Sequence, residues 1–229
     1  MLGTIVNALA IVVGGFAGVL LKGGLPEKMS TTIMQGVGLA VILLGLSSAM
    51  EGMPYIMEII FFLVIGTVIG EWIDIEKRLE KIGDRLEVRF SRGGSTFSKG
   101  FVAASLLYCV GAMAIMGALE SGLNGNHEIL FAKSVLDGIT SIVFASTLGV
   151  GVIFSAASVL IYQGSITLLA GGAAEILTET VVLQMSATGG LLIVGLGLSM
   201  VLSSKIRVAN MLPSVLLPIV YHVIQNLIL

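Results

Sequence analysis

The stretch KSVLDGITSIVFASTLGVGVIFSAASVLIYQGSITLLA, residues 133–170, decides the fold of this chain. It is nearly all apolar and about 38 residues long. A membrane-spanning helix needs about 20 apolar residues, so the stretch is too long for one span and just long enough for two short ones. Two spans would meet near Gly149, Val150 and Gly151, and one long span is the alternative.

Further apolar runs of spanning length lie on both sides of this stretch, at residues 2–21, 31–50, 54–73, 100–119, 183–202 and 208–229. The whole chain of 229 residues is 56% hydrophobic and only 11% charged, with a mean hydropathy of +1.05. Soluble domains are about 25% charged, so these apolar side chains must face a lipid bilayer rather than water. The sequence predicts an all-α, polytopic membrane helix bundle of seven or eight spans, with residues 1–229 forming one transmembrane domain.

One segment, residues 74–99, differs in kind from the apolar runs around it. Ile75, Leu79, Ile82 and Leu86 recur at helical spacing, and charges fill most positions between them. This pattern predicts an amphipathic helix over residues 74–90 of the segment. The helix is expected to lie on the membrane surface or to extend from it, and the alternative is a docking site for a partner or for anionic lipid.

The basic residues predict how the chain is oriented. Segment 74–99 holds seven of the twelve Lys and Arg residues, and positively charged loops stay in the cytoplasm. The N-terminus is then outside. With eight spans every basic residue except Lys133 falls on the cytoplasmic side, whereas seven spans would place Lys205 and Arg207 outside, so the rule favours eight.

The two ends of the chain resemble each other in sequence. Residues 36–50 read GVGLAVILLGLSSAM and residues 188–202 read TGGLLIVGLGLSMVL, and upstream GTIVNALA at 3–10 aligns with GVIFSAAS at 151–158. The match predicts that residues of about 1–73, the first three spans, are repeated in about 151–229, the last three, around central spans at 100–150. With eight spans the repeats are inverted, an arrangement common in secondary transporters, and with seven they are parallel.

Polar residues inside the spans are the candidate functional residues, because ionisable groups in hydrocarbon are costly. Lys133 and Asp137 are four residues apart and can pair on one helical face. Asp137 is the first candidate for an ion-coupled or proton-coupled carboxylate, and the alternative is a structural pair with Lys133 near the outer surface. The remaining candidates for a substrate or ion pathway are Ser141, Ser155, Gln163 and Asn7.

Asn7 and Ser155 occupy matching places in the two halves of the repeat. They are plausible symmetric site residues on that account. The alternative role is hydrogen bonding between helices, which contributes about 1 kcal/mol in membranes.

The sequence offers little chemistry for an enzyme. Two histidines, His127 and His222, and one cysteine, Cys109, are too few for a zinc cluster, and the chain has no HExxH, GxSxG or GxxxxGK motif. A Ser134–Lys133 dyad is the one alternative, but adjacent residues point about 100° apart on a helix. We therefore expect no enzymatic activity, no metal and no cofactor.

Several stretches are similar to a known family. GTIVNALAIVVGG at 3–15, KSVLDGITSIVFASTLGVGVIFSA at 133–156, YQG at 162–164 and KIRVANMLPS at 205–214 resemble the YqgA/YdfK-like family of bacterial inner-membrane proteins, which carries a label of unknown function. The resemblance covers almost the whole chain. It implies a polytopic inner-membrane protein, and it assigns no substrate and no role to any candidate residue.

Together these patterns predict a membrane transporter or channel for a small solute or ion, with Asp137 and its polar neighbours lining the path. The alternative is a non-transporting membrane scaffold or sensor that acts through segment 74–99. Expected partners are the lipid bilayer and the transported solute or ion. The net charge of −2 argues against nucleic acid. Ridges of small residues, Ala10-Gly14-Gly18 and Gly66-Gly70, predict helix contacts within the chain or between copies in a homo-oligomer.

Overall fold

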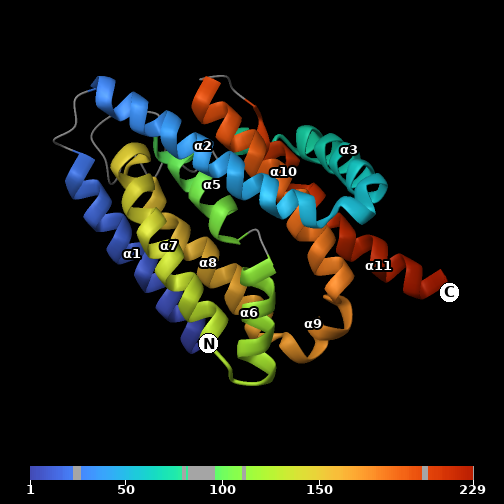
Figure 1. The fold of residues 1–229 in the computed structure, drawn as a ribbon. Coiled ribbons are helices and arrows are strands. Elements are labelled where there is room, and N and C mark those ends of the chain that lie inside the picture. The colour runs from blue at the N-terminus through green and yellow to red at the C-terminus, as the bar shows by residue number, and fades with distance from the viewer. Residues whose placement is uncertain (23–26, 79–80, 82–95, 110–111, 203–205, 229) are drawn as a thin grey trace.

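The computed structural model describes every residue except 23–26, 79–80, 82–95, 110–111, 203–205 and 229. The described residues form helices and contain no strand, in agreement with the predicted all-α class (Figure 1). In chain order the elements are α1 (Leu2–Lys22), α2 (Glu27–Glu51), η1 (Met53–Tyr55), α3 (Ile56–Ile73), α5 (Thr96–Cys109), α6 (Ala112–Leu123), α7 (Glu128–Leu148), α8 (Gly151–Leu168), α9 (Ala170–Ile176), α10 (Glu179–Leu202), η2 (Val208–Val215) and α11 (Leu217–Ile228).

Within the described residues, seven helical segments are long and apolar enough to cross a membrane. Residues 97–109 of α5 and 113–123 of α6 pass the same test together but are bent by 58°, so this pair is an eighth candidate, either a broken span or a re-entrant loop. The prediction of a polytopic bundle with seven or eight spans is therefore confirmed.

The stretch 133–170 forms two helices rather than one. Helix α7 ends at Leu148, and α8 begins at Gly151. Between them Gly149 has φ 81° and ψ −158°, a backbone conformation that residues with a Cβ rarely adopt, and its N–H donates to the carbonyl of Ala145. The open alternative of a single long span is excluded, and the turn lies where the sequence places it.

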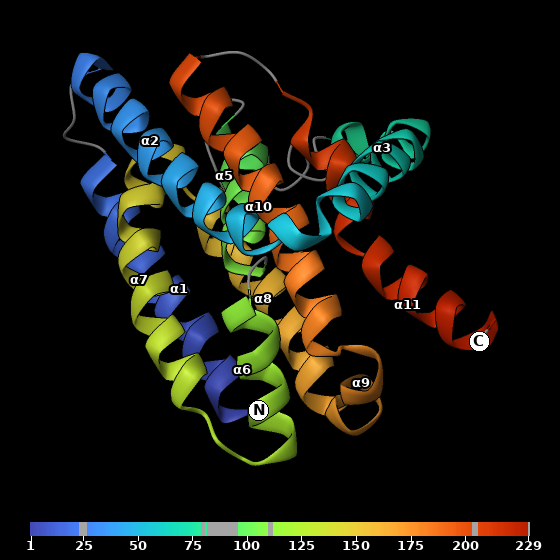
Figure 2. The ribbon, with the colours of Figure 1, turned by 45° about the vertical axis from the view of Figure 1, so that its right-hand side comes forward.

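Helices α2 and α10 are neighbours in the bundle (Figure 2) and pack closely through glycines. A Cβ at Gly45 would lie 2.6 Å from the carbonyl oxygen of Gly190, and one at Gly197 would lie 2.7 Å from that of Gly38. Since residue numbers rise along one helix as they fall along the other, the two helices run antiparallel. Only residues without a side chain allow this approach.

Both predicted small-residue ridges are used within the chain. A Cβ at Gly66 or Gly70 would collide with the backbone of η2, at Ser214 and Asn210 respectively. On α1, a Cβ at Gly14 would collide with the carbonyl oxygen of Gly138 in α7. The Gly66-Gly70 ridge therefore allows η2 to pack closely on α3, and the Ala10-Gly14-Gly18 ridge allows α7 to pack closely on α1.

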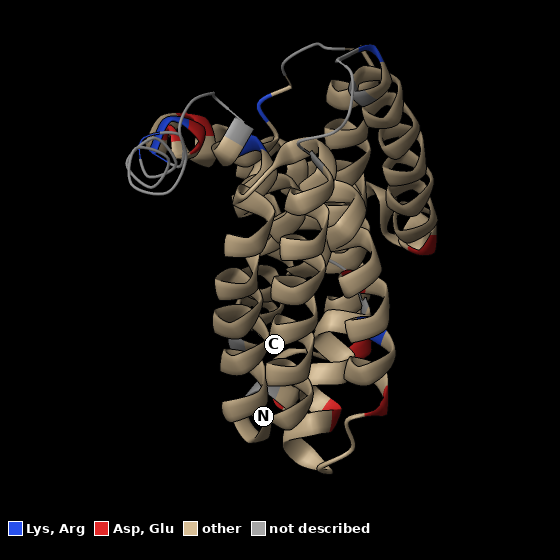
Figure 3. Cartoon of the chain, turned by 90° about the vertical axis from the view of Figure 1, so that its left-hand side faces the viewer, with Lys and Arg blue, Asp and Glu red and all other residues tan. Residues whose placement is uncertain are grey.

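Charge is unevenly distributed along the bundle. Figure 3 shows Lys and Arg gathered at the end where α1 ends and α2 begins, whereas carboxylates occur toward both ends. Lys133, inside α7, is the predicted exception. Most of the amphipathic helix expected at 74–90 lies outside the described residues, including Leu79, Ile82 and Leu86. Residues 75–78 are helical and follow Asp74, the C-cap of α3.

Candidate functional site

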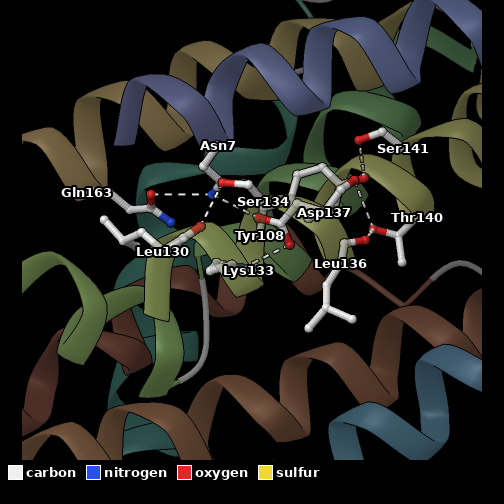
Figure 4. Close-up of polar contacts among 10 residues, drawn as sticks. All are labelled: Asn7, Tyr108, Leu130, Lys133, Ser134, Leu136, Asp137, Thr140, Ser141 and Gln163. Carbon is white, nitrogen blue, oxygen red and sulfur yellow. Dashed lines mark hydrogen bonds and ion pairs between the residues drawn. The ribbon is translucent and has the colours of Figure 1, made fainter. Parts of the chain in front are cut away.

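Four polar side chains from three different helices meet inside the bundle (Figure 4). In α7 the ammonium group of Lys133 donates to Oδ1 of Asp137 at 3.0 Å. From α1, Nδ2 of Asn7 donates to Oδ2 of the same carboxylate, also at 3.0 Å. The amide of Asn7 also reaches Oε1 of Gln163 in α8, at 3.4 Å. We call Asn7, Lys133, Asp137 and Gln163 the central network.

The central network is withdrawn from the protein surface. Asn7 and Gln163 have no exposed area, and Lys133 and Asp137 are 7% and 5% exposed. Asp137 is the tenth of 21 residues in α7, which places its carboxylate far from both helix ends. A single charge at such a depth costs several kcal/mol, so the pairing of a cation with an anion is what makes this position tolerable.

The hydrogen-bonding polarity of the network is fixed by the carboxylate. The ionised carboxylate of Asp137 only accepts hydrogen bonds, so Asn7 must turn its NH2 group toward Asp137 and its Oδ1 elsewhere. The same NH2 group then meets the oxygen of Gln163, which turns Nε2 of Gln163 away.

This arrangement leaves two polar atoms without a partner. Oδ1 of Asn7, an acceptor, and Nε2 of Gln163, a donor, are both buried and form no hydrogen bond with the described part of the chain. Each unsatisfied buried polar group costs about 1–3 kcal/mol. The network therefore presents one free acceptor and one free donor.

A second polar contact adjoins the network and involves a residue that sequence reasoning missed. The hydroxyl groups of Tyr108, from α5, and Ser141, one turn beyond Asp137 in α7, are hydrogen-bonded at 2.8 Å, and both residues are fully buried. A lone tyrosine in an apolar run gives no sequence signal of this role, because aromatic residues are ordinary components of apolar cores. Ser141 itself was predicted, and the structure places it next to the network.

Ser155 does not join the central network. It is fully buried in α8, where its hydroxyl group donates to the carbonyl oxygen of Val152 at 2.6 Å. Asn7, at the matching place in the predicted repeat, bonds across helices instead. The two residues that the alignment pairs therefore have different partners in the structure.

Further polar contacts between helices lie on either side of the network. Thr4 and Thr167 approach each other at 3.5 Å between α1 and α8, one turn from Asn7 and Gln163 toward the end with the N-terminus. On the other side, Ser105 of α5 donates to Ser158 of α8 at 2.9 Å.

A surface hollow lies close in sequence to the central network but is not lined by it. It has a volume of about 470 Å³, lies between α6 and α7, and is lined by Met113, Met116, Glu128, Ile129 and Ala132. No residue of the central network lines this hollow. In this conformation the network is enclosed by the helices that carry it.

A second charged cluster lies at the basic end of the bundle and joins the two halves of the chain. Arg207 pairs with Glu71 and, at 2.6 Å, with Asp74, while Asn210 donates to Glu71. Asn210 also accepts a hydrogen bond from the backbone N–H of Glu76 at 2.7 Å. Nothing in the spacing of Glu71 along the sequence indicates these partners, which lie more than 130 positions away.

Comparison with known proteins identifies the family. The chain is 34% identical over 221 residues to the Bacillus subtilis (strain 168) protein named "Uncharacterized membrane protein YdfK", covering 95% of this chain and 94% of that protein. It is 31% identical over 224 residues to "Uncharacterized protein YqgA" of Escherichia coli (strain K12), with the same shares covered. No solved structure matches the chain. Residues 2–223 match the family described as "Protein of unknown function (DUF554)", and the chain is therefore a membrane protein of the DUF554 family, as the resemblance in its sequence predicted.

Proposed function

We propose that this protein is a transporter or channel for a small solute or ion in the bacterial inner membrane, and not an enzyme. The observation that carries the proposal is the central network, an ion pair and two amides buried in the middle of a membrane-spanning bundle. The path of the transported solute or ion runs past Asp137, Lys133, Asn7 and Gln163. Ser141 lies on that path as well. Ser155 is the least supported member of the predicted set, because the hydrogen bond that its hydroxyl group donates within the described residues goes to its own helix.

Stability alone is a poor explanation for such a network. Replacing a buried ion pair by apolar residues of similar volume is often neutral or stabilising, and hydrogen bonds between membrane helices average about 0.6 kcal/mol. Two of the polar atoms also remain unpartnered. A network that contributes little to folding and is still incomplete is better suited to meeting a ligand.

The polar contacts on either side of the network suggest the direction of the path. Thr4 and Thr167 lie toward the end with the N-terminus, and the Tyr108–Ser141 pair lies on the other side of Asp137. Hydroxyl groups can both donate and accept, so they can exchange hydrogen bonds with a moving solute. Together with the network they form a polar series through an apolar bundle.

The glycine contacts of α2 and α10 support an inverted repeat. The repeat alignment pairs Gly38 with Gly190 and Gly45 with Gly197, whereas the contacts join Gly38 to Gly197 and Gly45 to Gly190. A two-fold axis between the helices produces this crossed pattern, because each half of the contact is then the image of the other. An axis in the membrane plane relates the halves of many secondary transporters.

We place the basic end of the bundle, with segment 74–99, in the cytoplasm and the N-terminus outside, following the distribution of Lys and Arg. The rival function is a scaffold or sensor that acts through segment 74–99. It requires no opening to the central network, which is where the two proposals differ.

The test is flux through the purified protein in liposomes. Proton, sodium and potassium gradients and gradients of small solutes are imposed in turn, and uptake is compared with that of protein-free liposomes. We expect a flux that Asp137→Asn abolishes, while Glu179→Gln, an exposed carboxylate at the start of α10, leaves it unchanged. Size-exclusion profiles confirm that both variants are folded. If no probe enters faster than in protein-free liposomes, the scaffold reading is preferred.

A further inference from the structure

We infer that the central network binds a small solute without net charge that carries a hydrogen-bond donor and an acceptor close together, as hydroxyl and amide compounds do. The inference rests on the proposed function and narrows its substrate class from "solute or ion" to one kind of solute. It is drawn from which atoms of the network are free and which are already bonded.

The free atoms define what the ligand must offer. Oδ1 of Asn7 needs a donor, and Nε2 of Gln163 needs an acceptor. The orientation of both amides follows from the carboxylate of Asp137, which holds the NH2 group of Asn7, and reversing either amide would set like groups against each other. Hydroxyl and amide compounds offer both a donor and an acceptor, so such a solute has both kinds of partner that the free atoms lack.

The charges of the network disfavour an ion at the same place. The charges of Lys133 and Asp137 sum to zero, and each carboxylate oxygen already accepts a hydrogen bond, one from the ammonium group and one from Asn7. A cation would approach an ammonium group in a medium of low dielectric constant, and an anion would approach a carboxylate. An uncharged solute meets neither repulsion and leaves the ion pair intact.

Two contacts near the free atoms, on the side of the network toward the N-terminus, are loose. Gly164 follows Gln163, and a Cβ built on it would meet only Cε of Met1, at 3.5 Å. One turn away the hydroxyl groups of Thr4 and Thr167 are 3.5 Å apart, a weak contact that a hydroxylic solute can replace. Both features lie between the network and the end with the N-terminus.

Stopped-flow light scattering on liposomes containing the purified protein tests the inference. The vesicles are mixed with hyperosmotic glycerol, urea or acetamide, and the rate of reswelling reports solute entry. We expect faster reswelling than in protein-free liposomes. Gln163→Leu should slow it about fivefold or more, the effect of losing one hydrogen bond to the solute. Gln163→Asn keeps the amide group on a shorter side chain, so its reswelling rate should be intermediate. This variant replaces the leucine variant in the test if the latter does not fold.

The matched control is Gln184→Leu, which removes another buried glutamine, in α10 and outside the network. An equal effect of both leucine variants overturns the inference. The inference is also overturned if sodium or the zwitterion glycine crosses in a way that depends on Asp137 while the uncharged solutes do not cross. The proposed function stands in that case. Faster water efflux with no solute entry also overturns the inference. If no probe of any kind crosses, both the inference and the proposed function fail.

Discussion

Replacing Gly45 by alanine should weaken the contact between α2 and α10, whereas the same change at Gly36 should not. A Cβ at Gly45 would lie 2.6 Å from the carbonyl oxygen of Gly190 and 2.7 Å from the backbone nitrogen of Val194. Both are backbone atoms, so they cannot move aside without shifting a helix. Gly36 lies on the same helix, and a Cβ there would have nothing within 4 Å.

The expected magnitudes follow from these surroundings. Overpacking of a tight contact costs about 1–3 kcal/mol. At Gly36 alanine should instead stabilise the helix by about 0.5–1 kcal/mol, because glycine loses more backbone entropy on folding. Thermal unfolding of the purified protein in detergent should show opposite shifts, of about 2–4 °C for each kcal/mol in a chain of this length. If Gly45→Ala is as stable as Gly36→Ala, the close antiparallel contact is wrong, and the argument for the repeat loses its main support.

Three further predictions concern the polar clusters. Asp137→Leu alone should destabilise the protein by about 3–5 kcal/mol, since it leaves the Lys133 ammonium buried and unpaired, and adding Lys133→Met should recover most of that loss in the same thermal assay. Tyr108→Phe should cost about 0.5–1.5 kcal/mol, and a double-mutant cycle with Ser141→Ala should assign the loss to their hydrogen bond; additive effects would contradict the contact. Arg207→Gln should lower stability by no more than about 1 kcal/mol, because the ion pairs of Arg207 are partly exposed. The loss should be smaller in high salt, and a loss that does not depend on salt would contradict this account.

The span pattern was open to prediction because it depends on local properties of the chain. The apolar run at 2–21 became α1, and the run at 183–202 lies within α10. The break in the stretch 133–170 was also predictable in place, since Gly149 can adopt the positive φ that the turn requires. Hydrophobic length and glycine placement are read directly from a sequence.

The composition of the central network was partly open to prediction, and its assembly was not. Lys133 and Asp137 share a helical face by their spacing alone. Gln163 was a candidate because it is polar within an apolar run, and Asn7 also because of its place in the predicted repeat. That Asn7 meets Asp137, and that Gln163 meets Asn7, depends on how α1 and α8 pack against α7. No local pattern carries that information.

The contacts that sequence reasoning missed share one feature, a large separation along the chain. Arg207 meets Glu71 and Asp74 because η2 packs on α3 through Gly66 and Gly70. The glycine ridge was recognised as a contact face, but its partner was not. Small residues show that a close neighbour exists without identifying it.

The central claim, a path that passes the network, is tested most directly by cysteine accessibility in intact cells and in inverted membrane vesicles. Single cysteines at Thr4, Ser141 and Gly172 are introduced into a Cys109→Ser background and treated with a membrane-impermeant thiol reagent. Gly172, exposed at the end of the bundle with the N-terminus, should label from outside and serves as the control. The account predicts labelling of Thr4→Cys from outside and of Ser141→Cys from the cytoplasm, although both positions are fully buried in this conformation. If neither position labels from either side while Gly172→Cys does, the network is sealed, and a transport path through it is contradicted.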